Sequence, residues 1–214
     1  MPILDHLLWA VPDLDQAIDH FEQLTVVRPA FGGEHPGRGT RNALVSLGPR
    51  QYIELIGPDP AQPDSTRESG VARAVADVRA PTLITFAVAH NDLEGLGAAA
   101  TARDWPFQGP VPGSRQQPDG SLLRWRLGHT AGTRFGRYAP FYIDWQDSPH
   151  PAARAPGGLE LVDFEVRHPD ADGLAALFSD LGVEPRPQHQ ATPELRATLR
   201  TPRGTTVVLS SQAT

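Results

Sequence analysis

The chain has 214 residues, with 19 arginines and no lysine against 25 acidic residues, so its formal net charge is −6 at pH 7. It has no cysteine, and these absences exclude a lysine Schiff base, a P-loop lysine, a thiolate metal site and a disulfide. An acidic chain without an apolar run of about 20 residues is a poor candidate for binding nucleic acid or spanning a membrane. The N-terminal segment also lacks the basic start of a signal peptide, so we expect a cytoplasmic protein.

An internal repeat organises the chain. Three segments each combine an alternating apolar strand with a following helix pattern. An aspartate precedes each helix pattern, at Asp13, Asp92 and Asp170, where its side chain can accept a hydrogen bond from a free backbone amide. These aspartates are 79 and 78 residues apart (92 − 13 and 170 − 92). The repeated segments are 3–29, 82–107 and 160–185.

Further strand-like stretches follow each helix pattern, which predicts a strand, a helix and then two or three antiparallel strands, three times over. The predicted later strands are 42–47 and 51–56, then 122–127 and 140–145, then 195–200 and 205–209. Joints rich in proline and glycine separate the units. We expect a first unit at 1–60, a connecting segment at 61–80 with a short helix over 66–79, a second unit at 81–150 and a third unit at 158–211.

The first and third helices end differently in the sequence. Gly182 follows the third helix, as is usual where the chain turns into the left-handed conformation. The first helix is followed by Val26 and Val27, which are β-branched. If the chain needs a left-handed residue there, the cost is on the order of 1 kcal/mol; otherwise the helix stops in another way.

Alternation along the strands predicts which side chains share a face. Thr85 occupies the place in the second unit that His6 occupies in the first, because both precede the capping aspartate by the same interval (13 − 6 and 92 − 85). The same alternation puts Trp125 and Trp145 in the core. If they faced the concave, ligand-binding side of the sheet (the cup) instead, they would favour stacking on an aromatic ligand. We predict a concave polar face formed by His6, Tyr52, Glu54, Thr85, Arg124, Arg126, Tyr142 and Asp144.

Two loops are candidates to complete this face. Segment 32–42 is rich in glycine and carries His35, an acid or base near neutral pH, and Thr40 and Asn42, which can orient a ligand. A connecting loop that bonds its own backbone is the alternative interpretation. Arg115 lies in a long segment that can cover the cup and that ends in a predicted hairpin turn at Asp119-Gly120.

These patterns resemble the vicinal oxygen chelate superfamily, and more closely its glyoxalase-like domain proteins. The resemblance rests on His6 in LDHLLWAVPDL, the loop GGEHPGRGTRN, YIELIG around Glu54, LRWRL around Trp125 and PFYIDW around Tyr142. It implies an α+β fold in which repeated βαβββ modules form curled mixed sheets around a ligand cup, and here the third module is degenerate. It does not fix the reaction, because isomerases, dioxygenases and non-catalytic drug-binding proteins share this fold.

The resemblance also bears on metal binding. The superfamily's metal enzymes take a His and a Glu from each of two modules, and the matching positions here are His6, Glu54, Thr85 and Asp144. A threonine hydroxyl is a weak ligand for zinc or iron. We therefore expect no cofactor, with a divalent metal held by His6, Glu54 and Asp144 as the less favoured alternative.

We expect a small, anionic molecule to bind in the cup, and a lyase or isomerase reaction next to a carbonyl. His6 or Glu54 would be the general base, with His35 as a further catalytic candidate, and Arg124 and Arg126 would stabilise an anion. These arginines could instead neutralise Glu54 and Asp144. The alternative function is a non-catalytic protein that sequesters a small molecule or antibiotic. The protein is expected to be a monomer or a homodimer. His150 lies in the linker after the second unit and is a less favoured candidate for the rim of the cup.

Overall fold

The computed structural model describes residues 3–62, 70–117, 119–130 and 132–212. The first unit contains β1 (Ile3–Ala10), α1 (Leu14–Thr25), β2 (Ala30–His35), β3 (Thr40–Gly48) and β4 (Gln51–Pro58). The second contains β5 (Thr82–Ala89), α3 (Leu93–Thr101), β6 (Gln108–Gln116), β7 (Leu122–His129) and β8 (Phe141–Asp144). The third contains β9 (Glu160–His168), α4 (Ala171–Leu181), β10 (Gln188–His189), β11 (Glu194–Arg200) and β12 (Thr206–Ser210). Shorter connecting helices are α2 (Gly70–Asp77), η2 (Gly136–Tyr138) and η3 (Pro151–Ala153).

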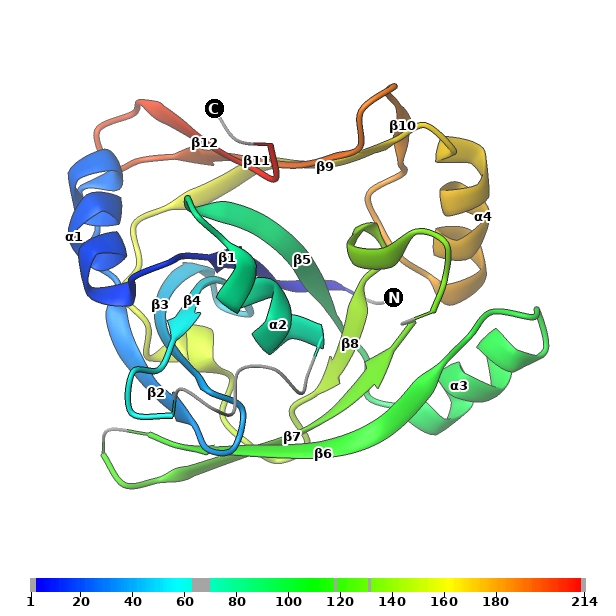
Figure 1. Cartoon of the computed structure of the whole chain (residues 1–214), viewed down its shortest axis with the longest axis horizontal. Helices are drawn as coiled ribbons and strands as arrows, with labels where there is room; N and C mark the ends of the chain where they lie inside the picture. Colours follow the sequence, from blue (N-terminus) through cyan, green and yellow to red (C-terminus); the bar gives the residue numbers. More distant parts are fainter. Residues whose placement is uncertain (1–2, 63–69, 118, 131, 213–214) are drawn as a thin grey trace.

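The first two units form one curled sheet of eight strands in the order β2-β3-β4-β1-β5-β8-β7-β6. At its centre β1 runs antiparallel to β5, while β1 pairs in parallel with β4 and β5 in parallel with β8. The two units are therefore related by a pseudo-twofold axis. The curl brings the end strands β2 and β6 side by side (Figure 1). Residues of both units line a hollow on the concave side of this sheet. The α+β fold of curled βαβββ modules predicted from the sequence is confirmed.

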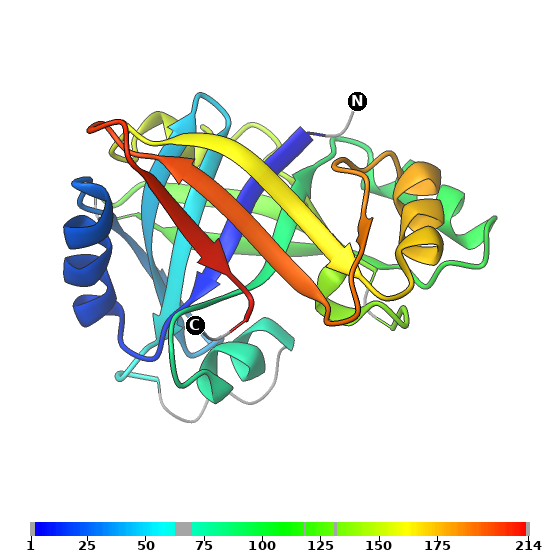
Figure 2. The same ribbon diagram turned by 90° about the horizontal axis from the view of Figure 1, so that it is seen from above.

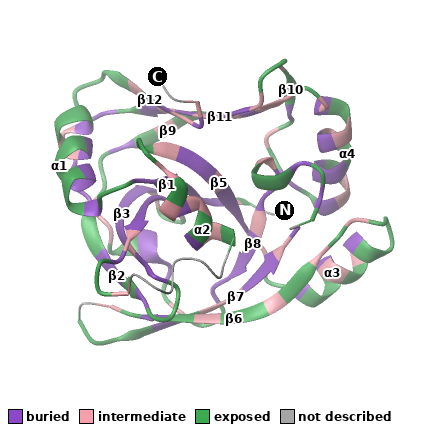
Figure 3. Ribbon diagram, in the orientation of Figure 1, coloured by how far each residue is buried: buried purple, intermediate pink, exposed green. Residues whose placement is uncertain are grey.

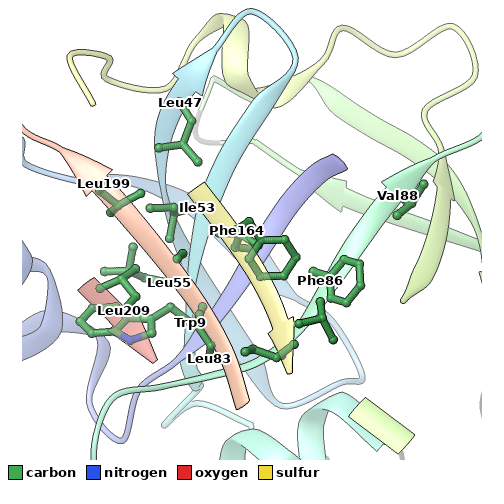
Figure 4. Packing of buried hydrophobic residues seen from close by; sticks show 14 of the residues in the cluster. Trp9, Leu47, Ile53, Leu55, Leu83, Phe86, Val88, Phe164, Leu199 and Leu209 are labelled. Carbon is green, nitrogen blue, oxygen red and sulfur yellow. The ribbon is translucent and has the colours of Figure 1, made fainter. Parts of the chain in front are cut away.

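The third unit covers the outer, convex face of this sheet. Its strands form a separate four-stranded sheet in the order β10-β9-β11-β12, which lies across the first (Figure 2). Between the two sheets Phe86 and Phe164 meet edge to face with ring centroids 5.0 Å apart, and Leu199 and Leu209 pack into the same cluster as Trp9 (Figure 4). Burying each such large side chain contributes about 1.5–3 kcal/mol, so the third unit stabilises the sheet that carries the hollow.

The helices begin where the capping aspartates predict. Asp13 accepts a hydrogen bond from the Gln16 amide, Asp92 from that of Gly95 and Asp170 from that of Gly173. The three long helices α1, α3 and α4 each turn a buried side toward the sheets and an exposed side outward (Figure 3). No helix in the described ranges is both long and apolar enough to cross a lipid bilayer.

The unusual end of α1 is a left-handed turn at a valine. Val26 has φ 60° and ψ 13°, the conformation that Gly182 adopts after α4 with φ 67°. Its amide donates to the Glu22 carbonyl at 2.8 Å, which closes the helix. A β-branched residue is disfavoured in this region, so the backbone is strained at this point.

Two edge strands lie where the sequence predicted loops. β2 overlaps the start of the glycine-rich segment 32–42. β6 contains Pro110 and Pro112, which have no backbone N–H to donate to a strand partner. Both strands pair on one side with a neighbouring hairpin strand. Edge positions tolerate such residues, and for that reason their sequences do not read as strands. Of the helix predicted over 66–79, the structure has Gly70–Asp77 as α2, and 66–69 lie outside the described residues.

Candidate functional site

A cavity of about 560 Å³ lies in the concave side of the eight-stranded sheet. This volume is in the range of small-molecule sites. α2 closes one side through Val75, which packs against Leu8, Ile56 and Ile84 from the sheet. The predicted site residues that line the cavity are His6, His35, Thr40, Asn42, Tyr52, Glu54, Thr85 and Arg115.

A β-bulge places a second acidic residue beside His6. The pairing of β1 with β5 shifts register between Leu4 and His6, so Asp5 has no partner of its own in the ladder. A bulge turns an extra side chain out of regular alternation. Here Asp5 Oδ1 lies 2.7 Å from His6 Nδ1, and both side chains are buried.

Asp5 is a buried carboxylate with three partners. Besides His6, His150 Nε2 lies 3.1 Å from Oδ2 and Trp145 Nε1 donates to Oδ2 at 3.0 Å. Burial alone would raise the pKa of Asp5, but its hydrogen bonds with His150 and His6 lower that pKa to about 2. An ionised carboxylate can only accept hydrogen bonds, so His6 Nδ1 and His150 Nε2 must both carry protons.

The His6 ring is therefore fixed in one tautomer and one orientation. Tyr52 stacks on its face, with ring centroids 4.4 Å apart and planes 16° apart, and Phe141 meets it edge-on at 5.5 Å. With Nδ1 bound to Asp5, the other nitrogen, Nε2, points to Glu54 Oε2 at 3.6 Å. In the neutral ring Nε2 is unprotonated and can act as a base.

Glu54 stands between two imidazoles. Its Oε1 accepts a hydrogen bond from Asn42 Nδ2 at 2.7 Å and lies 3.8 Å from His35 Nε2. On the other side it faces His6, so an acid–base cluster of three side chains meets in the cavity. These side chains come from β1, β2 and β4, which the sheet order places close together.

His35 belongs to this cluster as a neutral ring. Burial lowers its pKa to about 4, even though the nearby Glu54 carboxylate raises it. Its Nδ1 lies 2.8 Å from Thr40 Oγ1 across the β2–β3 hairpin. Near neutral pH His35 therefore offers a hydrogen-bonding imidazole rather than a cation.

Arg115 is a buried cation without a partner. Its side chain is 5 % exposed, its Nη1 is buried without a hydrogen-bond partner, and desolvation lowers its pKa. No described residue makes a hydrogen bond or ion pair with its side chain, although the nearby Glu54 carboxylate acts to raise its pKa. A desolvated guanidinium without an anion is costly, and this one lines the cavity with Glu54.

Two glycines of β2 make room for Arg115. A Cβ on Gly33, whose φ is +139°, would lie 2.7 Å from the backbone oxygen of Gln116 and 3.0 Å from Arg115 Nη1. A Cβ on Gly32 would lie 2.8 Å from the same nitrogen. These glycines let the end strand β6 come close to β2.

Most of the polar face predicted for the second unit does not point into the cavity, although Thr85 does. Arg126 binds Asp144 at 2.7 Å and Glu94 at 2.6 Å on the outer side of the sheet, and Arg124 is exposed. Tyr142 is fully buried in the core between the sheet and α3, where burial raises its pKa. Apart from Thr85, none of these predicted residues lines the cavity. For Arg126 and Asp144 the alternative of internal neutralisation holds.

The opposite face of these strands lines the cavity and is mostly apolar, with His129 at the end of β7 as its polar member. It carries Trp125 and Leu127 from β7, Phe141 and Ile143 from β8, and Trp145 just beyond β8. The prediction that the two tryptophans lie in the core is therefore wrong. It assumed that bulky residues pack outward under the helices, whereas this half of the cup is itself aromatic.

Register also corrects the assumed metal positions. Leu8 and Ala87 are equivalent, since both lie five residues before a capping aspartate (13 − 8 and 92 − 87). Leu8 pairs with Glu54 and Ala87 pairs with Phe141, so Phe141, not Asp144, corresponds to Glu54.

The two units therefore do not supply the four-ligand set that the superfamily's metal enzymes use. With Thr85 in place of the second histidine, the second unit contributes a hydroxyl and a phenyl ring, which do not fit that set. The alternative His6, Glu54 and Asp144 site fails because Asp144 lies outside the cavity. Among the residues with described positions, no cluster of three or more His, Asp or Glu side chains is arranged to hold a metal ion.

Several residues in or directly behind the cavity were not predicted from the sequence as part of the site. Asp5 escapes alternation because of the bulge, and Arg38 and Arg137 line the mouth as exposed cations. His150 was a less favoured candidate for the rim; it lies buried behind His6 and shares Asp5 with it. Of these residues, Arg38 could have been found from the sequence, because it lies in the glycine-rich segment 32–42.

Comparison with known proteins agrees with this architecture. The profile of a family described as "Glyoxalase-like domain" matches residues 4–182. A search of curated proteins gives no match. Among solved structures, a hypothetical protein from Staphylococcus aureus is similar over 98 % of this chain and 86 % of that chain, with a TM-score of 0.69 and 15 % identity.

Two epimerase structures share the fold more distantly. A methylmalonyl-CoA epimerase in complex with methylmalonyl-CoA and NH4+ has a TM-score of 0.50 and 15 % identity, covering 71 % of this chain and 99 % of that chain. The methylmalonyl-CoA epimerase from Mycobacterium tuberculosis has a TM-score of 0.47 and 23 % identity, covering 70 % of this chain and 91 % of that chain. Likeness at this level concerns the fold alone.

Proposed function

Since the chain belongs to the glyoxalase-like domain family, we propose that it binds a small carboxylate with a neighbouring carbonyl and moves a proton at the carbon beside that carbonyl. The observation that supports this most is the placement of an unpartnered, buried Arg115 in the same cavity as the acid–base cluster around Glu54. The first supplies a site for an anion, and the second supplies groups that exchange protons.

Binding begins with Arg115. A substrate carboxylate would accept hydrogen bonds from its guanidinium and supply a directly bonded anion, whereas Glu54 acts on Arg115 without contact. Arg38 and Arg137 at the mouth give a net acidic protein a cationic entrance, which favours the approach of anions. Arg115 thus replaces Arg124 and Arg126 as the anion-binding group.

Proton transfer would use Glu54 and His6. In the proposed step the Glu54 carboxylate takes the proton from the carbon. The C–H electron pair forms a carbon–carbon double bond while the carbonyl π pair moves to the oxygen, which gives an enolate. His6 Nε2, 3.6 Å from Glu54, can hold the proton, because Asp5 stabilises the resulting imidazolium. Return of the proton to the oxygen or to a neighbouring carbon completes an isomerisation.

The positions of these groups favour a shift of a proton over inversion of a carbon centre. Inversion requires proton-transferring groups on both faces of the substrate. Glu54 and His6 lie on one wall, and the position equivalent to Glu54 on the other wall holds Phe141, with the His129 imidazole stacked on it rather than at that position. Tautomerisation needs one face only. The same first step would start a lyase reaction if the substrate carried a leaving group on the next carbon.

Hydrogen–deuterium exchange tests the proposal. Wild-type protein in D2O should exchange the C3 hydrogens of 2-oxobutanoate faster than buffer does, as followed by proton NMR. Glu54→Gln should lower the exchange rate at least 100-fold, and Arg115→Gln should weaken binding of the acid measured by calorimetry. Arg126→Gln, on the outer face, is the matched control and should behave as wild type.

The alternative is binding without turnover. The aromatic wall formed by Trp125, Phe141 and Trp145 favours it, because such a surface retains flat ligands without chemistry. Binding of 2-oxo acids with no exchange above buffer in the wild type would contradict the proposed reaction and support this alternative. If no 2-oxo acid bound, both the anion site and the reaction would be overturned.

A further inference from the structure

The two walls of the cavity differ in chemistry because they come from different units. The groups proposed to react, His6, His35 and Glu54, belong to the first unit. The facing strands of the second unit contribute mostly apolar and aromatic side chains at successive inward positions: Trp125 and Leu127 on β7, and Phe141 and Ile143 on β8. His129, the last residue of β7, also lines the cavity and stacks on Phe141 with ring centroids 5.8 Å apart. A ligand that fills the cavity must therefore match a polar wall with one side and an aromatic wall with the other.

The aromatic wall is built to present ring faces. Trp145 has already committed its indole N–H to Asp5, so it offers a ligand only its apolar surface. Trp125 lies at a centroid distance of 5.8 Å from Trp145, with the ring planes inclined at 60°, which forms an angled pair.

A glycine on the end strand seats Trp125. A Cβ on Gly113 would lie 2.4 Å from Trp125 Nε1, so only glycine lets the indole lie against β6. The position of the indole is thus set by the backbone of the neighbouring strand.

The aromatic wall is next to the anion site. Gly113 pairs with Trp125, and Arg115 lies two residues farther along β6, so Arg115 and Trp125 project from the same face of the sheet. Two residues along a strand span about 7 Å. A carboxylate bound at Arg115 thus leaves the neighbouring few ångströms of its molecule against Trp125.

We propose that the substrate is an aromatic carboxylate, in which a flat ring lies against Trp125 and Trp145 while the carboxylate binds Arg115 and the carbon beside the carbonyl faces Glu54. This inference rests on the proposed function for the reacting end and adds the chemistry of the other end. Rings stack on or pack edge-on against indoles, whereas a bulky saturated group fits such a surface less well.

A matched set of three acids tests the ring separately from the acid end. The acids are 2-oxobutanoate, 2-oxo-4-phenylbutanoate and 2-oxo-4-cyclohexylbutanoate, which share one 2-oxo carboxylate. Calorimetry on the full chain should show the phenyl compound binding at least tenfold more tightly than 2-oxobutanoate, and several-fold more tightly than the cyclohexyl compound. Equal affinities for 2-oxobutanoate and the phenyl compound, or for the phenyl and cyclohexyl compounds, would overturn the inference.

Variants locate the effect. Trp125→Leu should reduce the phenyl preference to less than threefold, whereas Arg115→Gln should weaken all three acids. Trp125→Phe keeps a ring and should keep most of the preference. A preference unchanged in Trp125→Leu would refute the assignment, and the wild-type comparison decides the inference even if that variant does not fold.

The outcomes separate this inference from the proposed function. Binding and exchange of 2-oxobutanoate without a phenyl preference would leave the proposed reaction standing and remove the aromatic substrate class. A phenyl preference without hydrogen exchange would remove the proposed reaction and leave the aromatic ligand class standing.

Discussion

Asp5 Oδ1 and His6 Nδ1 lie 2.7 Å apart although they are neighbours in one strand, where side chains normally point to opposite faces. The bulge in β1 makes this possible. It gives a buried carboxylate whose role is to hold the His6 ring so that Nε2 faces Glu54. Asp5 does not itself line the cavity, so it is a positioning residue.

Replacing Asp5 with Asn tests this role. The amide can donate to His6 Nδ1 and so favours the tautomer with a proton on Nε2, which cannot act as a base. Asp5→Asn should lower kcat for exchange of 2-oxobutanoate about 10–100-fold with little change in KM. A purely structural role for Asp5 would instead reduce the folded fraction and leave kcat per folded molecule unchanged.

His150 supplies the control for Asp5. It shares the same carboxylate but points away from Glu54, and its Nδ1 lies 3.2 Å from the Ala152 amide. His150→Gln should therefore keep kcat within about threefold of wild type, because the Asp5–His6 bond stays in place. A loss as large as that of Asp5→Asn would mean that the whole buried cluster, and not the tautomer of His6, sets the rate.

His35 should make stability depend on pH. Its pKa falls from 6.5 to about 4 on folding, so between these values the unfolded chain binds a proton that the folded chain does not. Stability is therefore lost as pH falls through this window, by about 1.4 kcal/mol per pH unit. From pH 7 to pH 5 the loss due to His35 should be about 2 kcal/mol.

Urea unfolding at pH 7 and pH 5 measures this effect. His35→Gln cannot titrate, so the free energy of unfolding of this variant should fall about 2 kcal/mol less between the two pH values than that of wild type. His189, an exposed histidine that bonds only the Pro169 carbonyl, provides the comparison, and His189→Gln should follow wild type. Identical pH dependence in wild type and His35→Gln would show that His35 is protonated in the fold.

The first unit could be predicted closely from its sequence. β1 and β4 pair over a continuous stretch, with His6 opposite Tyr52 and Leu8 opposite Glu54, so alternation correctly grouped His6, Tyr52 and Glu54. Asp5 could not be found in this way, because nothing in a single sequence marks a bulge. The capping aspartates were found because each cap depends on residues only three apart.

The second unit was harder for a physical reason. Alternation defines two faces of β7 and β8, but it does not say which one is concave. The charged face of Arg126 and Asp144 seemed to suit a cup, yet these residues neutralise each other outside it. β8 has only four residues, so its register, and with it the correspondence of Phe141 to Glu54, comes from pairing that the sequence does not display.

Gly33 should be required for the position of Arg115. An added methyl group in Gly33→Ala would lie against the Gln116 carbonyl and Arg115, and would push β6 away from β2. Gly37, with φ +71° and nothing within 4 Å of its added Cβ, is the matched control for strain alone. Gly33→Ala should be less stable than Gly37→Ala by about 1–3 kcal/mol and should bind 2-oxobutanoate about tenfold more weakly. Equal effects of the two substitutions on urea unfolding and calorimetry would contradict this packing.

Val26 offers a stabilising substitution far from the cavity. Both Val26→Gly and Val26→Ala remove the side chain, but only glycine adopts φ 60° without strain. Val26→Gly should therefore be more stable than Val26→Ala by about 1 kcal/mol in urea unfolding. Gly182→Ala, at the equivalent end of α4, should be destabilised by a similar amount. If Val26→Ala were as stable as Val26→Gly, the end of α1 would not be left-handed, whereas the expected order would show that the first unit carries strain that the third relieves with glycine.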